Sequence, residues 1–229
     1  LFRSPAGQSS ATIPVDVLDD SVVELTETVI VTLTGTNNLG ATIDPANHTA
    51  TVSIADEDTA TVSIEKVHDG VETATPGHGK FRVTLTKFSA TDTVLSYTVT
   101  GTALPGAGND YVTLSGTVTI MAGDATADIE VAVLDDDVVE DTETVMITLE
   151  AITSGDEDIS IDSQNATAQI GISDEDAATL SIARIEDGAE GAVTTSGRFR
   201  VTQTKPSSTD TVLSYTVAGS ASPGVGNDY

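Results

Sequence analysis

Ten consecutive residues in the middle of the chain carry six carboxylates. The run extends from Leu134 to Glu143 and reads LDDDVVEDTE, and a related run from Leu18 to Glu27 reads LDDSVVELTE. Two carboxylates about 4 Å apart repel each other by roughly 4 kcal/mol at an effective dielectric constant near 20. Crowding of this kind is typical of a cation site. Many hard oxygen ligands at flexible spacing favour Ca²⁺ over Mg²⁺ or Zn²⁺.

Further acids lie beside the ends of the segments that alternate like β-strands. Because antiparallel strands return to the same pole of a sandwich, we expect acids at alternate strand ends to converge there. A shared pole would give one acidic group enough oxygens for more than one ion. The candidate carboxylates in the complete copy of the pattern are Glu72, Asp110, Asp135, Asp136, Glu140, Glu143, Asp174, Glu175 and Asp176.

The chain is a tandem repeat with a period of about 117 residues. Residues 81–111 recur at 199–229, which is 118 positions later, and residues 18–33 recur at 134–149, which is 116 positions later. A length difference in the loop near Asn37 explains the change. This period is the size of a domain rather than of a solenoid turn. We therefore expect the C-terminal half of a repeat in residues 1–58, a complete domain in 59–176 and the N-terminal half of a repeat in 177–229, so that the chain resembles an excerpt of a longer array.

Apolar and polar residues alternate along the complete repeat with turn residues between the runs, which predicts half-buried antiparallel strands. Seven strands in one repeat favour an immunoglobulin-like β-sandwich. The predicted fold class is therefore all-β, with tandem seven-stranded sandwiches, one complete domain being flanked by two half-domains. The strands are expected near residues 60–64, 81–85, 95–99, 118–120, 129–133, 145–149 and 168–172, and in the N-terminal half near 13–17, 29–33 and 50–54.

The composition excludes several classes of function. The formal net charge of −27, from 36 acidic and 9 basic residues, opposes binding to nucleic acid and to anionic membrane surfaces. No apolar run approaches the roughly 20 residues that span a bilayer, so direct membrane insertion is not expected. Cysteine is absent, so no disulfide or thiol chemistry is available. Apolar residues make up 38% of the chain and alternate as in strands, which opposes disorder.

The combination of motifs resembles the Calx-beta domain. The motifs are Asn109-Asp110-Tyr111, the strand at 116–120, the triple Asp from Asp135 with Glu140 and Glu143, and the closing Asp174-Glu175-Asp176. The resemblance implies a calcium site held by Glu72, Asp110, Asp135, Asp136, Glu140, Glu143, Asp174 and Asp176. The corresponding positions are Asp19, Asp20, Glu24, Glu27, Asp56 and Asp58 in the N-terminal half, and Glu190 and Asp228 in the C-terminal half.

Two departures from the family pattern leave the calcium stoichiometry open. Glu175 interrupts what is a triple Asp in the family, and the loop before Asp110 carries a Leu-Pro-Gly insertion. A plainly solvated acidic surface is the alternative reading of these runs. Two acids of the complete repeat are not acidic in the earlier copy, where Ser21 stands for Asp137 and Leu25 for Asp141. Neither Asp137 nor Asp141 belongs to the implied ligand set.

Other chemistries fit the sequence less well. An EF-hand needs a Gly in the middle of its loop, which the acidic run lacks, and a glycosidase needs two carboxylates across a groove rather than a single group. No histidine recurs between repeats, which opposes a zinc site or a catalytic His. The formal glycosylation sequons at Asn47 and Asn165 are interpreted as incidental, and the Gly-rich stretch 106–109 as a turn.

These observations predict a non-enzymatic calcium-binding structural repeat of an extracellular surface adhesin or fibre, in which Ca²⁺ makes the domain junctions rigid. The expected partners are adjacent repeats or other copies of the chain, arranged head to tail, which could complete the half-domains and form a filament. The sequence identifies no adhesion ligand. The alternative is a calcium-sensing regulatory module in which ion binding changes the angle between domains.

Overall fold

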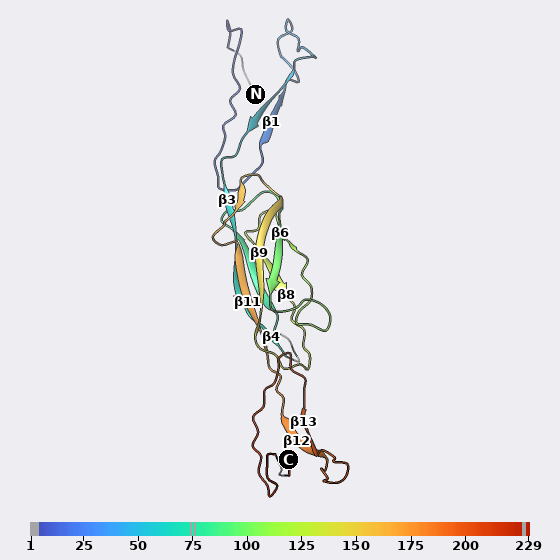
Figure 1. Ribbon diagram of the computed structural model, residues 1–229. Helices are drawn as coiled ribbons and strands as arrows, with labels where there is room; N and C mark the ends of the chain where they lie inside the picture. Colours follow the sequence, from blue (N-terminus) through green and yellow to red (C-terminus); the bar gives the residue numbers. More distant parts are fainter. Residues whose placement is uncertain (1–4, 74, 76, 226–227) are drawn as a thin grey trace.

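The computed structural model describes residues 5–73, 75, 77–225 and 228–229, so the first four residues of the expected N-terminal half lie outside the described part. Figure 1 shows an elongated molecule with its two ends far apart and the largest sheets in the middle. Within the described residues every regular element is a strand, and no helix is long and apolar enough to cross a membrane. The all-β prediction is confirmed.

Thirteen strands follow one another along the described chain. Their composition, rich in Val, Thr and Ile, suits the pleated and half-buried surface of a sheet. They are β1 (Glu27–Thr32), β2 (Thr49–Ile54), β3 (Ala60–His68), β4 (Gly70–Glu72), β5 (Gly79–Leu85), β6 (Thr93–Gly101), β7 (Thr117–Ile120), β8 (Thr126–Val131), β9 (Glu143–Ser154), β10 (Ile159–Ile161), β11 (Thr167–Asp174), β12 (Leu180–Glu186) and β13 (Arg198–Gln203).

Strands β3 to β11 build two sheets in the middle of the molecule. One sheet has the order β10-β3-β5-β8, and the other has the order β4-β11-β9-β6-β7. The seven strands expected in the complete repeat are present. The two short strands β4 and β10 were not predicted, because three residues are too few to show a period of two. Both pair in parallel, β4 with β11 and β10 with β3.

The core lies between these two sheets. Alternate residues of each long strand are buried, as in β5, where Phe81, Val83 and Leu85 face inward. Their partners include Tyr97 from β6 and Ile147 from β9 in the opposite sheet. The core is mostly aliphatic, with Phe81 as its largest fully buried side chain.

The terminal segments each contain one two-stranded sheet, β1 with β2 and β12 with β13. The strand predicted near residues 13–17 is wrong, because the structure shows no strand there. Its counterpart β8 exists through its pairing with β5, and the N-terminal segment contains no β5. Residues 211–217, whose counterpart is β6, form no strand either. A strand needs a partner for its backbone hydrogen bonds, whatever its sequence pattern.

Replacing Phe81 by Ala is expected to lower the free energy of unfolding of the central domain by about 3–5 kcal/mol. The substitution leaves a cavity between two sheets that cannot collapse to fill it. Chemical denaturation followed by circular dichroism measures this. Phe88→Ala is the matched control, because the Phe88 side chain is about half exposed. A loss of less than about 1 kcal/mol in Phe81→Ala would contradict the proposed core.

Candidate metal centre

Glu72 and Asp174 stand side by side at one pole of the central sandwich. Glu72 ends β4, Asp174 ends β11, and the two residues are paired in the parallel ladder between these strands. The short strand β4 therefore fixes a carboxylate that would otherwise lie in a flexible loop. Glu72 is only 4% exposed, so its carboxylate is largely removed from water.

Asp110 reaches the same pole through a loop that the backbone holds tightly. Its Oδ2 accepts a hydrogen bond of 2.6 Å from the Leu104 backbone N–H, and its carbonyl accepts one of 2.9 Å from the Leu134 N–H. The next residue, Tyr111, is buried and forms an antiparallel bridge with Val133 at the end of the β8 segment. The Asn-Asp-Tyr motif thus anchors one aspartate between two loops.

The acidic loop folds back on itself through its own aspartates. The Val138 N–H donates to Asp136 Oδ1 at 2.6 Å, an Asx turn that leaves the second oxygen of Asp136 available. The Glu140 N–H donates to Asp174 Oδ2 at 2.7 Å, which ties the loop to the end of β11. Glu143, the first residue of β9, is paired with Ile172 on β11.

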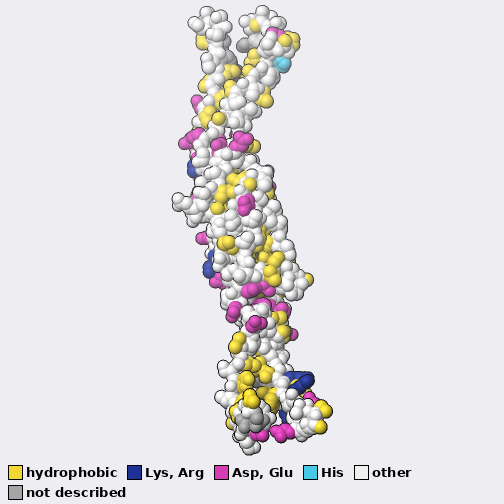
Figure 2. Space-filling view, viewed as in Figure 1, with side chains coloured by type: hydrophobic (Ala, Val, Ile, Leu, Met, Phe, Trp, Pro, Cys, Tyr) yellow, Lys and Arg dark blue, Asp and Glu magenta, His cyan; other side chains and the backbone are white. Residues whose placement is uncertain are grey.

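These elements bring carboxylates from four separate parts of the chain together. One oxygen each of Asp110, Glu140 and Glu143 lies within 4.8 Å of the other two. Asp136 and Asp174 are close enough to act on the charge of Glu72 as well. Figure 2 shows acidic side chains gathered in two bands, one near each end of the central domain. We call the six residues Glu72, Asp110, Asp136, Glu140, Glu143 and Asp174 the acidic cluster.

Burial and mutual repulsion make the acidic cluster resist ionisation. Burial, together with the neighbouring charges of Asp136 and Glu140, raises the pKa of Glu72 to about 7. Burial, together with the hydrogen bond to Asp110, raises the pKa of Glu143 to about 8. The pKa of Glu140 is raised by burial and by Asp110. At neutral pH the cluster therefore holds charges that the protein by itself does not neutralise.

The donor set fits a hard divalent cation. All six side chains offer carboxylate oxygens, and nitrogen or sulfur ligands that would favour zinc are absent from this described cluster. Ca²⁺ accepts six to eight oxygens at variable geometry, as loop carboxylates provide, whereas Mg²⁺ demands a stricter octahedron. Every member of the acidic cluster was among the residues predicted from the sequence.

Two predicted ligands of the complete repeat, Asp135 and Asp176, are not members of the acidic cluster. Asp135 is exposed. Asp176 is mostly buried but forms an ion pair with Lys205 of the following repeat, which also pairs with Asp137 at 3.0 Å. Sequence reasoning missed this lysine. The recurrence of Lys-Xaa-Ser at Lys87 and Lys205 was the signal that could have found it.

The N-terminal segment repeats half of the arrangement. The Val22 N–H donates to Asp20 Oδ1 at 2.8 Å, and the Glu24 N–H donates to Asp56 Oδ2 at 2.9 Å, as in the central domain. Burial and the nearby Glu27 raise the pKa of Glu24. Asp19, Asp20 and Glu24 line a cavity of about 240 Å³, and Asp58 forms an ion pair with Lys87.

The predicted residues of the C-terminal segment lie at the other end of the molecule. Asp228 Oδ2 accepts a hydrogen bond of 2.8 Å from the Ser222 N–H, which copies the Asp110 contact. Glu190 is exposed in a loop of the same segment. The chain does not bring these two acids to the N-terminal acids, because the two segments lie at opposite ends (Figure 1).

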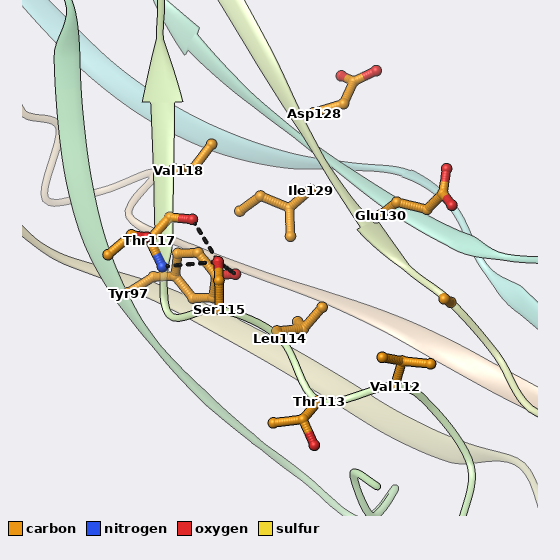
Figure 3. Close-up of a pocket in the computed structure, with 11 residues that line it drawn as sticks. Tyr97, Val112, Thr113, Leu114, Ser115, Thr117, Val118, Asp128, Ile129 and Glu130 are labelled. Atoms are coloured by element: carbon orange, nitrogen blue, oxygen red, sulfur yellow. Dashed lines mark hydrogen bonds between the residues drawn. The ribbon is translucent and has the colours of Figure 1, made fainter. Parts of the chain in front are cut away.

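A second cavity, of about 280 Å³, opens between the edges of the two central sheets, away from the acidic cluster. Figure 3 shows Tyr97, Val118 and Ile129 around it, with Ser115 beside the Tyr97 ring. The polar groups here bond to the chain itself, since Ser115 Oγ donates to the Thr117 carbonyl at 2.9 Å. We assign this cavity no function.

The raised pKa values predict that stability without metal falls as the pH rises. The folded state of the central domain binds more protons than the unfolded state between pH 4.5 and about 8, because the pKa of Glu72 is about 7 and that of Glu143 about 8 when folded. The free energy of unfolding therefore decreases over this window. Thermal melts with a chelator at pH 5 and pH 8 measure the difference. An equal or higher melting temperature at pH 8 would contradict the buried cluster.

Comparison with known proteins places the chain in one family. The matches to solved structures include the calcium-binding domain CBD12 of CALX1.1, with 26% identity and a TM-score of 0.39, covering 49% of this chain and 44% of that one. They also include the Calx CBD1 domain in its apo form, with 24% identity and a TM-score of 0.38, covering 50% of this chain and 99% of that one. A third, at 12% identity and a TM-score of 0.35, is a two-domain protein of unknown function from Bacteroides fragilis, with 55% of each chain covered.

This chain thus spans less than half the length of the first of these structures. The comparison with curated proteins gave no match. The sequence model of the Calx-beta domain, however, matches residues 2–58 and again residues 59–176, which together are most of the chain. The chain belongs to the Calx-beta domain family.

Proposed function

We propose that this chain is a non-enzymatic, calcium-binding structural module in which Ca²⁺ at the acidic cluster stiffens the junction between consecutive repeats. The observation that carries the proposal is the burial of several like charges at one pole, with the pKa of Glu72 and of Glu143 raised to about 7 and about 8. Such an arrangement destabilises the folded protein at neutral pH unless a cation is present.

The cluster lies where one repeat continues into the next. Asp174 ends β11, and β12 begins only a few residues later at Leu180. Ca²⁺ would supply the positive charge that this pole lacks. The ligands would be Glu72, Asp110, Asp136, Glu140, Glu143 and Asp174, whose places at this end of the central domain are fixed by contacts within that domain. Asp135 remains a candidate ligand of a further ion at the exposed rim.

The wider setting is part of the same proposal. An acidic array of repeats with boundaries near residues 58 and 176 suits an extracellular surface protein or fibre, because millimolar calcium there fills weak sites. The alternative, a regulatory sensor, would need a sharp change of interdomain angle at micromolar calcium. Small-angle scattering during a calcium titration distinguishes the two, since a spacer stiffens gradually at high calcium.

Calcium is expected to raise the melting temperature of the chain at pH 7.5. A ligand at 100 times its dissociation constant adds about 2.7 kcal/mol per site. Glu143→Gln should weaken this response, yet raise the melting temperature in chelator, because it removes one of the repelling charges. Differential scanning calorimetry with calcium and with chelator measures both effects.

Glu130→Gln is the matched control, because Glu130 is exposed on β8, outside the cluster. It should leave both melting temperatures unchanged. If the unaltered chain melts at the same temperature with calcium and with chelator, the acids form only a solvated surface and the proposed mechanism is wrong.

A second proposal concerns the partner of the terminal segments, which we infer to be another copy of the chain arranged head to tail. Each segment exposes apolar residues whose counterparts in the central domain are buried. Phe199 is 73% exposed and Tyr215 is 84% exposed, whereas the corresponding Phe81 and Tyr97 are 0% and 6% exposed. Exposed apolar surface on this scale marks an interface.

The central domain supplies the register of such a joint. Phe81 pairs with Ile129 between β5 and β8, and Tyr97 pairs with Leu149 between β6 and β9. Phe199 and Tyr215 correspond to Phe81 and Tyr97, and Ile13 and Leu33 correspond to Ile129 and Leu149. The same pairing would therefore place Phe199 opposite Ile13 and Tyr215 opposite Leu33 of a second copy. The same joint would unite Glu190 and Asp228 with the N-terminal acids. Because the two contact surfaces differ, repeated joining gives open filaments.

The chain is therefore expected to associate with rising concentration. The double change Phe199→Asp and Tyr215→Asp should abolish association, because it buries charge in the new core. Met121→Asp, at a side chain exposed on the central domain, is the control. Sedimentation velocity over a range of concentrations measures the size. A monomer at all concentrations would indicate that adjoining repeats of one polypeptide, rather than a second copy, cover these residues.

A further inference from the structure

The first junction between repeats contains a main-chain bridge beside the acids. Val23, in the acidic run of the N-terminal segment, is fully buried and forms a parallel bridge with Ser89. Its N–H donates to the Phe88 carbonyl at 2.9 Å, and its carbonyl accepts from the Ala90 N–H at 3.0 Å. One residue of the preceding repeat thus inserts into the β5–β6 loop of the next.

The second junction repeats this bridge with different residues. The Val139 N–H donates to the Pro206 carbonyl at 2.9 Å, and the Ser208 N–H donates to the Val139 carbonyl at 3.1 Å. The Ser207 hydroxyl adds a bond of 3.1 Å to the Val139 carbonyl. The same geometry recurs at both junctions, with a valine and a serine as the bridging pair each time, so the contact belongs to the repeat.

A lysine accompanies the bridge at both junctions. Lys87 Nζ pairs with Asp58, and Lys205 Nζ pairs with Asp176 and, at 3.0 Å, with Asp137. The two terminal aspartates have side chains only 15% and 11% exposed. Asp176 Oδ2 is buried without a hydrogen-bond partner among the described residues. The lysine is therefore the counter-charge that allows this carboxylate to be buried.

The lysine and the bridging serine form one recognition segment, Lys-Xaa-Ser. Lys87 lies two residues before Ser89, and Lys205 lies two residues before Ser207. Each lysine follows a strand that pairs with the first long strand of its repeat, β5 with β3 and β13 with β12. The backbone beside the serine bonds to the preceding acidic loop at both junctions, and the lysine reaches the closing aspartate of the preceding repeat. Hydrogen bonding to Asp176 raises the pKa of Lys205, so this cation stays charged at any physiological pH.

We propose that Lys-Xaa-Ser is a clasp by which each repeat recognises the acidic end of the preceding repeat, and that the clasp forms without calcium. The partner it fits is the acidic end of a repeat. That end offers the backbone N–H and carbonyl of Val23 or Val139, together with the buried closing aspartate, Asp58 or Asp176. The clasp goes beyond the proposed function because a fixed ammonium, not a metal ion, neutralises the outer acids. It assigns Asp58 and Asp176 to lysine, and leaves the inner acidic cluster to calcium.

Amide hydrogen exchange of the intact chain in chelator tests the clasp. The bridge amides of Val139 and Ser208 are expected to be protected in the unaltered chain. Lys205→Met should speed their exchange up to about fivefold, the upper end of what one partly exposed ion pair contributes. Lys205→Arg should restore most of the protection. The amides of Val23 and Ala90, at the other junction, should not change.

The reciprocal variant and two controls complete the test. Lys87→Met should free the Val23 and Ala90 amides and leave the Val139 junction protected. Lys66→Met removes a lysine whose ion pair with Asp69 lies within one repeat, so it should change neither junction. The amides of β5 and β9 report whether each variant still folds. Unprotected bridge amides in the unaltered chain, or unchanged exchange in both lysine variants, would overturn the proposal.

The outcome is independent of the calcium proposal, because every measurement is made in chelator. If the chain does not bind calcium but the lysine variants speed amide exchange, only the proposed function is wrong. If calcium raises the melting temperature but the lysine variants leave amide exchange unchanged, only the clasp is wrong.

Discussion

The crowding of negative charge at one pole of a sandwich is the constraint on which the rest of the molecule depends. The carboxylates cannot move apart, because β4, β9 and β11 hold Glu72, Glu143 and Asp174 through backbone pairing. They are not fully solvated either, since Glu72 and Asp110 are buried. Repulsion of this kind must be offset by a cation or by protons, so the fold itself creates a demand for positive charge.

The sandwich supplies the rigidity that makes this demand specific. Its two sheets bury a continuous aliphatic core from Val62 to Ile172, and the strands that carry the acids belong to that core. A flexible acidic loop would simply spread its charges into water. The terminal segments show the contrast. The N-terminal segment has the same acids in the same turns, yet Asp20 and Glu27 are exposed where Asp136 and Glu143 are partly buried, because no second half encloses them.

The acids at the junction differ in their counter-charges. The outer aspartates have lysine partners from the next repeat, whereas no lysine or arginine pairs with the inner cluster around Glu143 among the described residues. The inner cluster is therefore the part that could hold a metal ion. The main-chain bridges at Val23 and Val139 then fix where the next repeat begins, independent of how many ions are bound.

The sequence by itself determined the period, the sandwich and every member of the acidic cluster. Alternation along a strand and acids at strand ends are local patterns that recur in each copy, so they are visible without coordinates. Other features were decided only by tertiary structure. The run around Val15 has the pattern of a strand but forms none, because the N-terminal segment contains no counterpart of β5 to pair with it.

Tertiary structure also decided which acids share a site. Asp174 and Asp176 are two residues apart and chemically alike, yet one faces Glu72 and the other faces Lys205. Likewise, Glu72 and Glu175 are both strand-end acids in the sequence, but only Glu72 is buried. A sequence pattern shows how many carboxylates lie at strand ends. Their direction, burial and counter-charge depend on the loops and the neighbouring repeat that surround them, which are fixed only when distant segments pack.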